Sequence, residues 1–259
     1  MVLRIGFLFA VLAFSIFAPV EAQQDELTSL NQRVVRLYGQ GKYITAIKLA
    51  ERSLKLAESR FGPQHPKVGE TLSNLAALYS AVRRYPQAEP LYKRSLAIRE
   101  NKLGPNHPSV ATTLNNLASL YESTGRYSKA AMHYRRTIAI LERTLGIDHP
   151  RVGVTSSNLA GLYRRGARYA EAELLYKRSL AISRKAFGDD HASVGDALNN
   201  LALLYHTSGR NSDSESLYKR SLAIREKALG PGHKSVGQSL NNLAGLYEDQ
   251  GRYVEAEPL

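Results

Sequence analysis

The chain has 259 residues and carries 35 Lys and Arg against 23 Asp and Glu, a formal net charge of +12. A composition of 43% hydrophobic and 22% charged residues is ordinary for a folded protein and excludes bulk disorder and collagen-like structure. Cysteine is absent, which excludes disulfides, thiolate zinc sites and cysteine nucleophiles.

The first 22 residues have the layout of a secretory signal peptide. Arg4 supplies the positive charge, and the uncharged apolar stretch 5–18 follows it. Small residues at positions 20 and 22 suit cleavage before Gln23. We expect residues 1–22 to direct export, to the bacterial periplasm or the extracellular space. If uncleaved, the segment would be a short membrane anchor, since a spanning helix needs about 20 apolar residues.

The rest of the sequence repeats every 42 residues, after a short lead of residues 23–26. Glycine, histidine and asparagine recur in five copies: Gly62, Gly104, Gly146, Gly188 and Gly230; His65, His107, His149, His191 and His233; Asn74, Asn116, Asn158, Asn200 and Asn242. Such a period indicates units that stack on their neighbours in one array, residues 27–259. The units are predicted at about 27–62, 63–104, 105–146, 147–188, 189–230 and a truncated 231–259.

Each unit is predicted to contain two helices. Pro66 suits the first turn of a helix, and the apolar residues between positions 68 and 79 follow a 3.6-residue period. Glycines such as Gly125 suit the end of this helix. A second helix should begin near residue 86, because Pro86 and Pro90 are tolerated only where the backbone amide needs no helical partner. The predicted fold class is therefore all-α.

The repeated motifs Asn-Leu-Ala-x-Leu-Tyr, Gly-Arg-Tyr-x-x-Ala and Leu-Tyr-x-Arg-Ser-Leu are similar to those of tetratricopeptide repeats. The 42-residue spacing with Leu-Gly-Pro-x-His-Pro resembles the kinesin-light-chain type, which is also common in bacterial proteins. The resemblance implies a right-handed α-solenoid of antiparallel helix pairs with about five and a half repeats. It also implies that the first helices line a concave groove. The heptad coiled coil of kinesin light chains is missing, so motor-cargo duty is not expected.

An asparagine ladder is predicted to face the groove, because a helical wheel places this position away from the core. A primary amide both donates and accepts hydrogen bonds, as the backbone of an extended peptide requires. The alternative is that these amides brace neighbouring helices or contact water. The candidate ligand-binding ladder consists of Asn74, Asn116, Asn158, Asn200 and Asn242.

A charged cluster is predicted in the middle of the same groove. Arg164 and Arg165 form a cationic pair, with Glu122 and His206 at the equivalent positions of the flanking repeats. Guanidinium groups suit a carboxylate on a bound segment. The alternative is internal pairing with Glu122 or Asp196.

Motifs that suggest catalysis or metal binding are better explained by the repeat. The five histidines lie in separate loops roughly 10 Å apart, too far to share one ion, and are expected to start helices or brace loops. The segment 230–235 lacks the strand that precedes a phosphate-binding loop. We expect no metal, no cofactor and no catalytic site.

The leading hypothesis is a non-catalytic scaffold that binds peptide or protein segments in its groove outside the cytoplasm. A first alternative follows from Leu259, which aligns with Leu91 inside a second helix. The array could be the targeting arm of a longer enzyme, such as the caspase-like CHAT proteins to which similar arrays are joined. A second alternative is binding of an anionic surface or nucleic acid by the basic dipeptides that begin at residues 93, 135, 177 and 219. A solvated outer face explains that charge more simply, so nucleic acid is not an expected partner.

Overall fold

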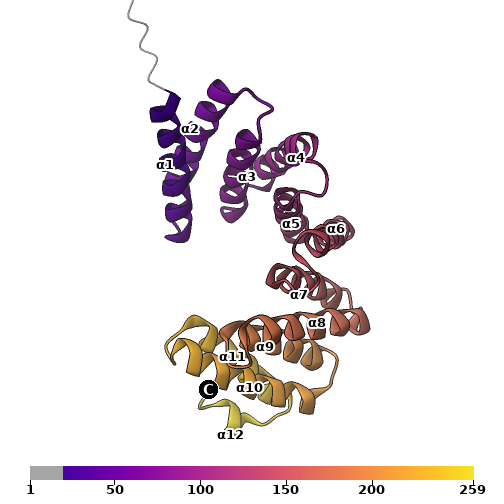
Figure 1. Cartoon of the computed structure of the whole chain (residues 1–259). Coiled ribbons are helices and arrows are strands. Elements are labelled where there is room, and N and C mark those ends of the chain that lie inside the picture. The colour runs from indigo at the N-terminus through magenta and orange to yellow at the C-terminus, as the bar shows by residue number, and fades with distance from the viewer. Residues whose placement is uncertain (1–19) are drawn as a thin grey trace, which may run out of the picture.

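The computed structural model describes residues 20–259, so the predicted signal peptide lies almost wholly outside the described residues. These residues form twelve α-helices and no strand, which confirms the all-α prediction (Figure 1). The helices are α1 (Val20–Gly39), α2 (Tyr43–Phe61), α3 (Pro66–Ala81), α4 (Tyr85–Leu103), α5 (Pro108–Ser123), α6 (Tyr127–Leu145), α7 (Pro150–Arg165), α8 (Tyr169–Phe187), α9 (Ala192–Thr207), α10 (Asn211–Leu229), α11 (Lys234–Asp249) and α12 (Tyr253–Ala256).

The helices are arranged as a solenoid of pairs. Each odd-numbered helix packs against the even-numbered helix that follows it, and that helix packs on the next pair. The pairs describe an arc, with the odd-numbered helices along its inner side and the even-numbered ones outside (Figure 1). Inner helices also touch one another directly, at α1–α3, α3–α5, α7–α9 and α9–α11. The concave wall is therefore built from the first helices of the repeats, as the family resemblance implies.

The repeated histidines start the inner helices, as predicted. In each copy the imidazole Nδ1 accepts a hydrogen bond from the backbone N–H two residues later, at 3.1–3.2 Å. This contact satisfies one of the amides that a helix leaves without a partner in its first turn. The five capping residues are His65, His107, His149, His191 and His233.

Glycine ends most inner helices by adopting a left-handed backbone. Gly125 has φ 73°, and the following Arg126 N–H donates to the Tyr121 carbonyl at 2.8 Å, which closes the helix. Two repeats make the same turn without glycine, because Arg83 and Ala167 occupy φ 59° and 55°. A side chain in this region costs roughly 1–2 kcal/mol, so these two turns are strained.

Of the two prolines of α4, Pro86 lies where predicted and Pro90 does not. Pro86 lies in the first turn, where its missing N–H is harmless. Pro90 lies one turn deeper, inside the helix, where an ordinary residue would donate to the carbonyl of residue 86. That hydrogen bond is absent because proline has no N–H.

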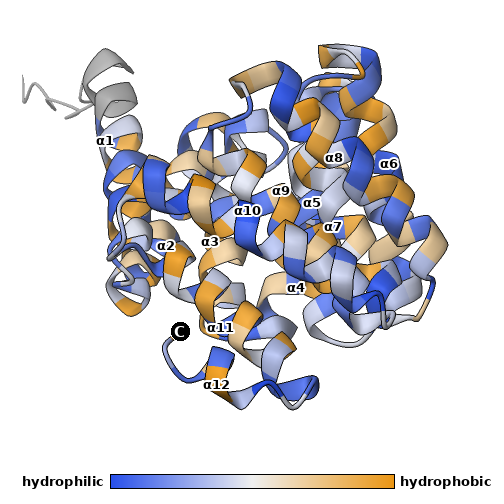
Figure 2. Ribbon diagram, turned by 90° about the horizontal axis from the view of Figure 1, so that it is seen from below, coloured by the Kyte–Doolittle hydropathy of each residue, from blue (hydrophilic) through white to orange (hydrophobic). Residues whose placement is uncertain are grey.

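The core follows the apolar side of every helix. Figure 2 shows hydrophobic and hydrophilic segments alternating along each ribbon, as expected for helices with one face buried. Leu72, Leu114 and Leu198 occupy the same place on α3, α5 and α9 and are fully buried. Tyr92 and its equivalents in the next three repeats are buried as well, and Tyr134 reaches Glu122 on the inner helix of its own pair. Within residues 20–259, no helix has the length and apolar character to cross a bilayer.

Candidate functional site

The asparagine ladder divides into two parts. All five side chains are half-buried on the inner helices. At the C-terminal end, Asn200 Nδ2 donates to Ser157 Oγ at 3.1 Å and Asn242 Nδ2 donates to Asn199 Oδ1 at 3.0 Å, so these two brace neighbouring inner helices. Within residues 20–259 no protein group forms a hydrogen bond with the other three amides, those of Asn74, Asn116 and Asn158.

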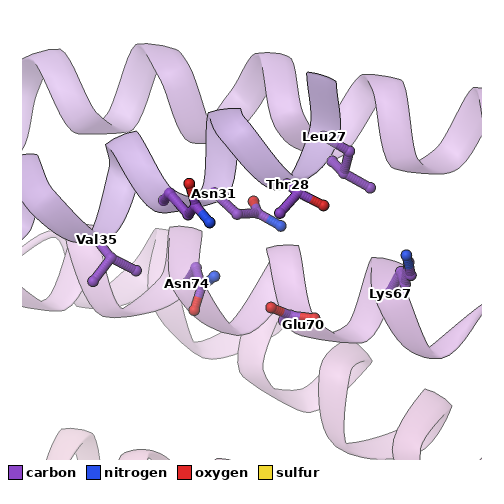
Figure 3. A pocket seen from close by; sticks show the side chains of 8 residues that line it. Leu27, Thr28, Asn31, Val35, Lys67, Glu70 and Asn74 are labelled. Carbon is purple, nitrogen blue, oxygen red and sulfur yellow. The ribbon is translucent and has the colours of Figure 1, made fainter. Parts of the chain in front are cut away.

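Two adjoining cavities lie on the inner wall at the N-terminal end. The first, of about 370 Å³, opens between α1 and α3 and includes Asn31, Glu70 and Asn74 in its lining. Figure 3 shows Asn31 of α1 facing α3, where Asn74 and Glu70 stand on neighbouring turns. The second, of about 290 Å³, reaches from Val35 across Asn74 to Asn116 on α5. Because Val35 and Asn74 line both cavities, the two form one hollow beside the unpaired amides.

The apolar side of this hollow comes from α1, which the sequence analysis did not assign to the site. Val35 is 63% exposed, and Tyr38 is 44% exposed at the edge of the second cavity. The repeat period contained the signal, because positions 35 and 38 fall 42 residues before Ala77 and Ser80 of the groove. The sequence places α1 in the first repeat unit, but this helix lacks the recurring asparagine and the arginine pair on which the predicted site was based.

The charges in the middle of the groove pair with one another. Arg165 Nη1 lies 2.8 Å from Glu122 Oε1, and Glu122 also accepts from the Tyr134 hydroxyl at 3.0 Å. His206 Nε2 lies 2.8 Å from Asp249 Oδ2. Glu122 therefore pairs with Arg165 within the protein, which is one of the internal pairings that the sequence left open. Ligand binding by this cluster stays a prediction. An incoming carboxylate has to compete with Glu122 for Arg165.

Arg164 and Arg165 have different partners within the protein. Arg164 is half-buried and lies beside the hydroxyl of Tyr176. Burial raises the pKa of Tyr176, and the positive charge and hydrogen bond of Arg164 oppose that rise. The two guanidinium groups thus serve different partners, Tyr176 on α8 and Glu122 on α5. Among residues 20–259, no three histidine or carboxylate side chains are grouped so that they could hold a metal ion.

Comparison with known families shows to which protein family this array belongs. The family model for the tetratricopeptide repeat matches residues 25–101, 68–143, 131–185, 151–227 and 193–259. The chain belongs to the tetratricopeptide repeat family. No curated protein matches it.

Solved tetratricopeptide structures share the fold of this array. The putative kinesin light chain of Podosopora anserina, with nearly identical repeats, has a TM-score of 0.68 at 25% identity, and the match covers 78% of this chain and 96% of that one. BtubC (BKLC) from P. vanneervenii has a TM-score of 0.67 at 24% identity, over 92% and 87%. The pilF protein of Pseudomonas aeruginosa has a TM-score of 0.62 at 16% identity, over 91% and 90%. The repeats are of the kinesin-light-chain type.

The outer face of the tetratricopeptide array carries the repeated basic dipeptides, and most of their charge is paired. Seven of the eight side chains form ion pairs with carboxylates, which weakens the attraction of this face for a polyanion. The pairs are Lys93–Glu89, Arg94–Glu58, Arg136–Glu100, Lys177–Glu173, Arg178–Glu142, Lys219–Glu215 and Arg220–Asp189.

Three of these carboxylates have pKa values lowered to about 2, namely Glu89, Glu173 and Glu215. For Glu89 burial opposes the shift, but hydrogen bonds from Lys93 and Arg126 outweigh it. For the other two, the largest cause is a hydrogen bond, from Lys177 to Glu173 and from Arg252 to Glu215. Their side chains are only 19%, 24% and 21% exposed, so solvent screens these contacts partly.

We expect the tetratricopeptide array to lose stability in acid because of these three residues. A carboxyl whose folded pKa lies below its ordinary value of 4.5 stabilises the fold above that pH. The contribution disappears as the pH falls from about 4.5 to about 2 and is roughly 1 kcal/mol each after screening. Denaturant titrations at pH 7 and pH 3 should show a smaller acid loss for the variant with Glu89, Glu173 and Glu215 replaced by Gln.

The control for this experiment is Glu226→Gln. Glu226 is exposed and forms no ion pair within the described residues. Its variant should keep the full acid loss of the wild type. An equal acid loss in the triple variant would show that other carboxyls control the acid response.

Proposed function

We propose that this tetratricopeptide protein is an exported scaffold that binds extended segments of partner proteins. The observation that carries the proposal is the hollow between α1, α3 and α5, where two adjoining cavities share Val35 and Asn74. Cavities of about 370 and 290 Å³ are near the lower end of the usual size of ligand pockets. Each suits one or two side chains of a peptide. The predicted signal peptide supports a location of this binding outside the cytoplasm.

The recognition mechanism combines an apolar anchor with amide contacts. A side chain of the bound segment packs on Val35 and Tyr38 and removes their exposed apolar surface from water. The amides of Asn74 and Asn116 have hydrogen-bonding capacity that the described protein groups leave unused. They can donate to and accept from the peptide backbone. Because the amides lie on successive helices of a stacked array, they are fixed before the ligand arrives.

The test uses peptides selected from a random phage-displayed library on the whole protein. Fluorescein-labelled copies are then titrated by anisotropy against the wild type and Ala77→Trp. Ala77 lines the second cavity, so a tryptophan there fills the space that the ligand needs. We expect a dissociation constant at least tenfold higher for Ala77→Trp. For Asn74→Ala we expect a three- to tenfold increase, as for one lost hydrogen bond.

The matched control is Ala97→Trp, which adds the same side chain at an exposed position of the outer helix α4. This variant should bind the selected peptides as the wild type does, and circular dichroism should show equal helicity for all three proteins. Equal affinity of wild type and Ala77→Trp would overturn the assignment of the hollow as the binding site.

A further inference from the structure

A tyrosine near the end of each inner helix from α3 to α11 contacts a carboxylate at four of the five interfaces between repeats. The Tyr79 hydroxyl donates to Glu51 at 2.7 Å, and the same contact recurs down the array at 2.8–3.2 Å. The later pairs are Tyr121–Glu89, Tyr205–Glu173 and Tyr247–Glu215. Ala131 occupies the position equivalent to these three glutamates at the remaining interface, between α6 and α7.

The cations that surround the carboxylate elsewhere are retained at this interface. Arg135 Nε donates to the Tyr163 hydroxyl at 2.8 Å, and Arg168 lies over the Tyr163 ring with 4.1 Å from its Cζ to the centroid. In the described part of the chain, no carboxylate lies within ion-pairing distance of Arg135, and Arg168 pairs with Glu171 alone. Where the glutamate is present, the equivalent of Arg168 reaches it at 2.6–3.0 Å, as Arg126, Arg210 and Arg252 do.

A cavity of about 380 Å³ opens beside these groups on the outer face, between α6 and α8 (Figure 1 shows both helices on the outside of the arc). Arg135 and Tyr163 form one side of it. Ile138, Leu159 and Leu174 supply apolar walls, and Leu174 is 71% exposed. A place for one negative charge therefore adjoins a place for an apolar side chain.

We propose that this cavity binds a partner protein segment in which an acidic residue stands next to a bulky apolar residue. The acidic side chain takes the place that Glu89, Glu173 and Glu215 occupy at the other interfaces, and accepts hydrogen bonds from Arg135 and Arg168. Guanidinium groups bind a carboxylate through directed, charge-assisted hydrogen bonds. The apolar side chain enters the cavity against Leu174.

Acidic residues at the rim of the cavity favour a ligand with one negative charge over a polyanion. Glu142 and Glu171 line it, and both are already paired, with Arg178 and Arg168. Their charges repel a second phosphate or carboxylate, so the site suits one negative charge beside apolar surface. This surface lies on the opposite side of the array from the concave hollow and goes beyond the function proposed for it.

The experiment titrates the ¹⁵N-labelled whole protein with acetyl-Glu-Leu-amide and records the arginine Nε–H signals, with Arg135→Lys identifying the signal of Arg135. We expect a saturable shift of that signal with a dissociation constant on the order of 1 mM, since only one carboxylate and one apolar side chain are recognised. Acetyl-Gln-Leu-amide should bind at least tenfold more weakly.

The decisive variant is Ala131→Glu, which restores the internal carboxylate found in the other repeats and should abolish the response to the acidic probe. Ala131→Gln has a side chain of nearly the same size without the charge and should retain it. Ala77→Trp, which blocks the concave hollow, should leave it unchanged. The proposal is overturned if both probes bind equally, if the response persists in Ala131→Glu, or if the Arg135 signal shows no saturable shift.

Discussion

Replacing Arg225 with Leu is expected to lower the free energy of unfolding by about 2–3 kcal/mol. Arg225 on α10 is 3% exposed and joins three helices. Its guanidinium donates to the Ser235 carbonyl at 2.9 Å, to Ser239 Oγ at 2.7 Å and to Asp196 Oδ1 at 2.7 Å. Asp196 stays solvated, so the loss comes mainly from the buried Ser239 hydroxyl, which loses its charged donor. Denaturant unfolding of the whole chain measures it.

The array itself contains the arrangement that should relieve this loss. At the equivalent position of α6 the residue is Leu141, which is fully buried. On the next helix, α7, Thr155 occupies the position equivalent to Ser239. Its hydroxyl donates a hydrogen bond to the Arg151 carbonyl at 2.9 Å. Adding Ser239→Thr to Arg225→Leu should therefore recover about 1 kcal/mol, one hydrogen bond. If Arg225→Leu is as stable as the wild type, hydrophobic packing compensates fully and the buried arginine does not stabilise the array.

Most of the fold could be predicted because each repeat contains the same local sequence signals for its helices. The apolar period marks the buried face, and His65-Pro66 marks where an inner helix starts. The histidine recurs in five copies and the proline in three, and together these signals outweigh exceptions such as Ala167, which takes a turn usually made by glycine. The prediction that Pro90 falls in the first turn is wrong, because the sequence does not fix where the helical hydrogen bonds begin.

The contacts of the candidate site were harder to predict because they join different repeats. Arg165 and Glu122 are 43 residues apart, and their contact depends on the rotation between successive inner helices, which no single repeat encodes. The same rotation brings Asn242 to Asn199. The substitution at Ala131 is visible in the sequence alignment of the repeats. Its consequence, an Arg135 that lies beside Tyr163 with no ion pair among the described residues, depends on the position of Tyr163, which only the structure gives.

Gly153→Leu is expected to destabilise the array by about 2 kcal/mol. A Cβ at Gly153 would lie 3.2 Å from Cγ2 and 3.4 Å from Cβ of Ile182, so a side chain forces α7 away from α8. On α5 the equivalent residue is Ala111, which carries a Cβ. The hydrogen bond from the Thr137 hydroxyl of the facing helix to the Ala111 carbonyl is correspondingly long, at 3.4 Å. The corresponding bond from Ser95 to Gly69 is 2.5 Å. Overpacking of this kind costs roughly 1–3 kcal/mol.

The same substitution at Gly237 should have the opposite sign. Gly237 holds the equivalent position on α11, but a Cβ there meets no atom within 4 Å, because no described helix covers it. Leucine is a better helix former than glycine by roughly 0.8 kcal/mol, and this gain is not offset by a clash. Gly237→Leu should therefore raise the free energy of unfolding, measured in the same denaturant titrations as Gly153→Leu. If both variants change stability in the same direction, helix propensity rather than close packing determines what this repeat position tolerates.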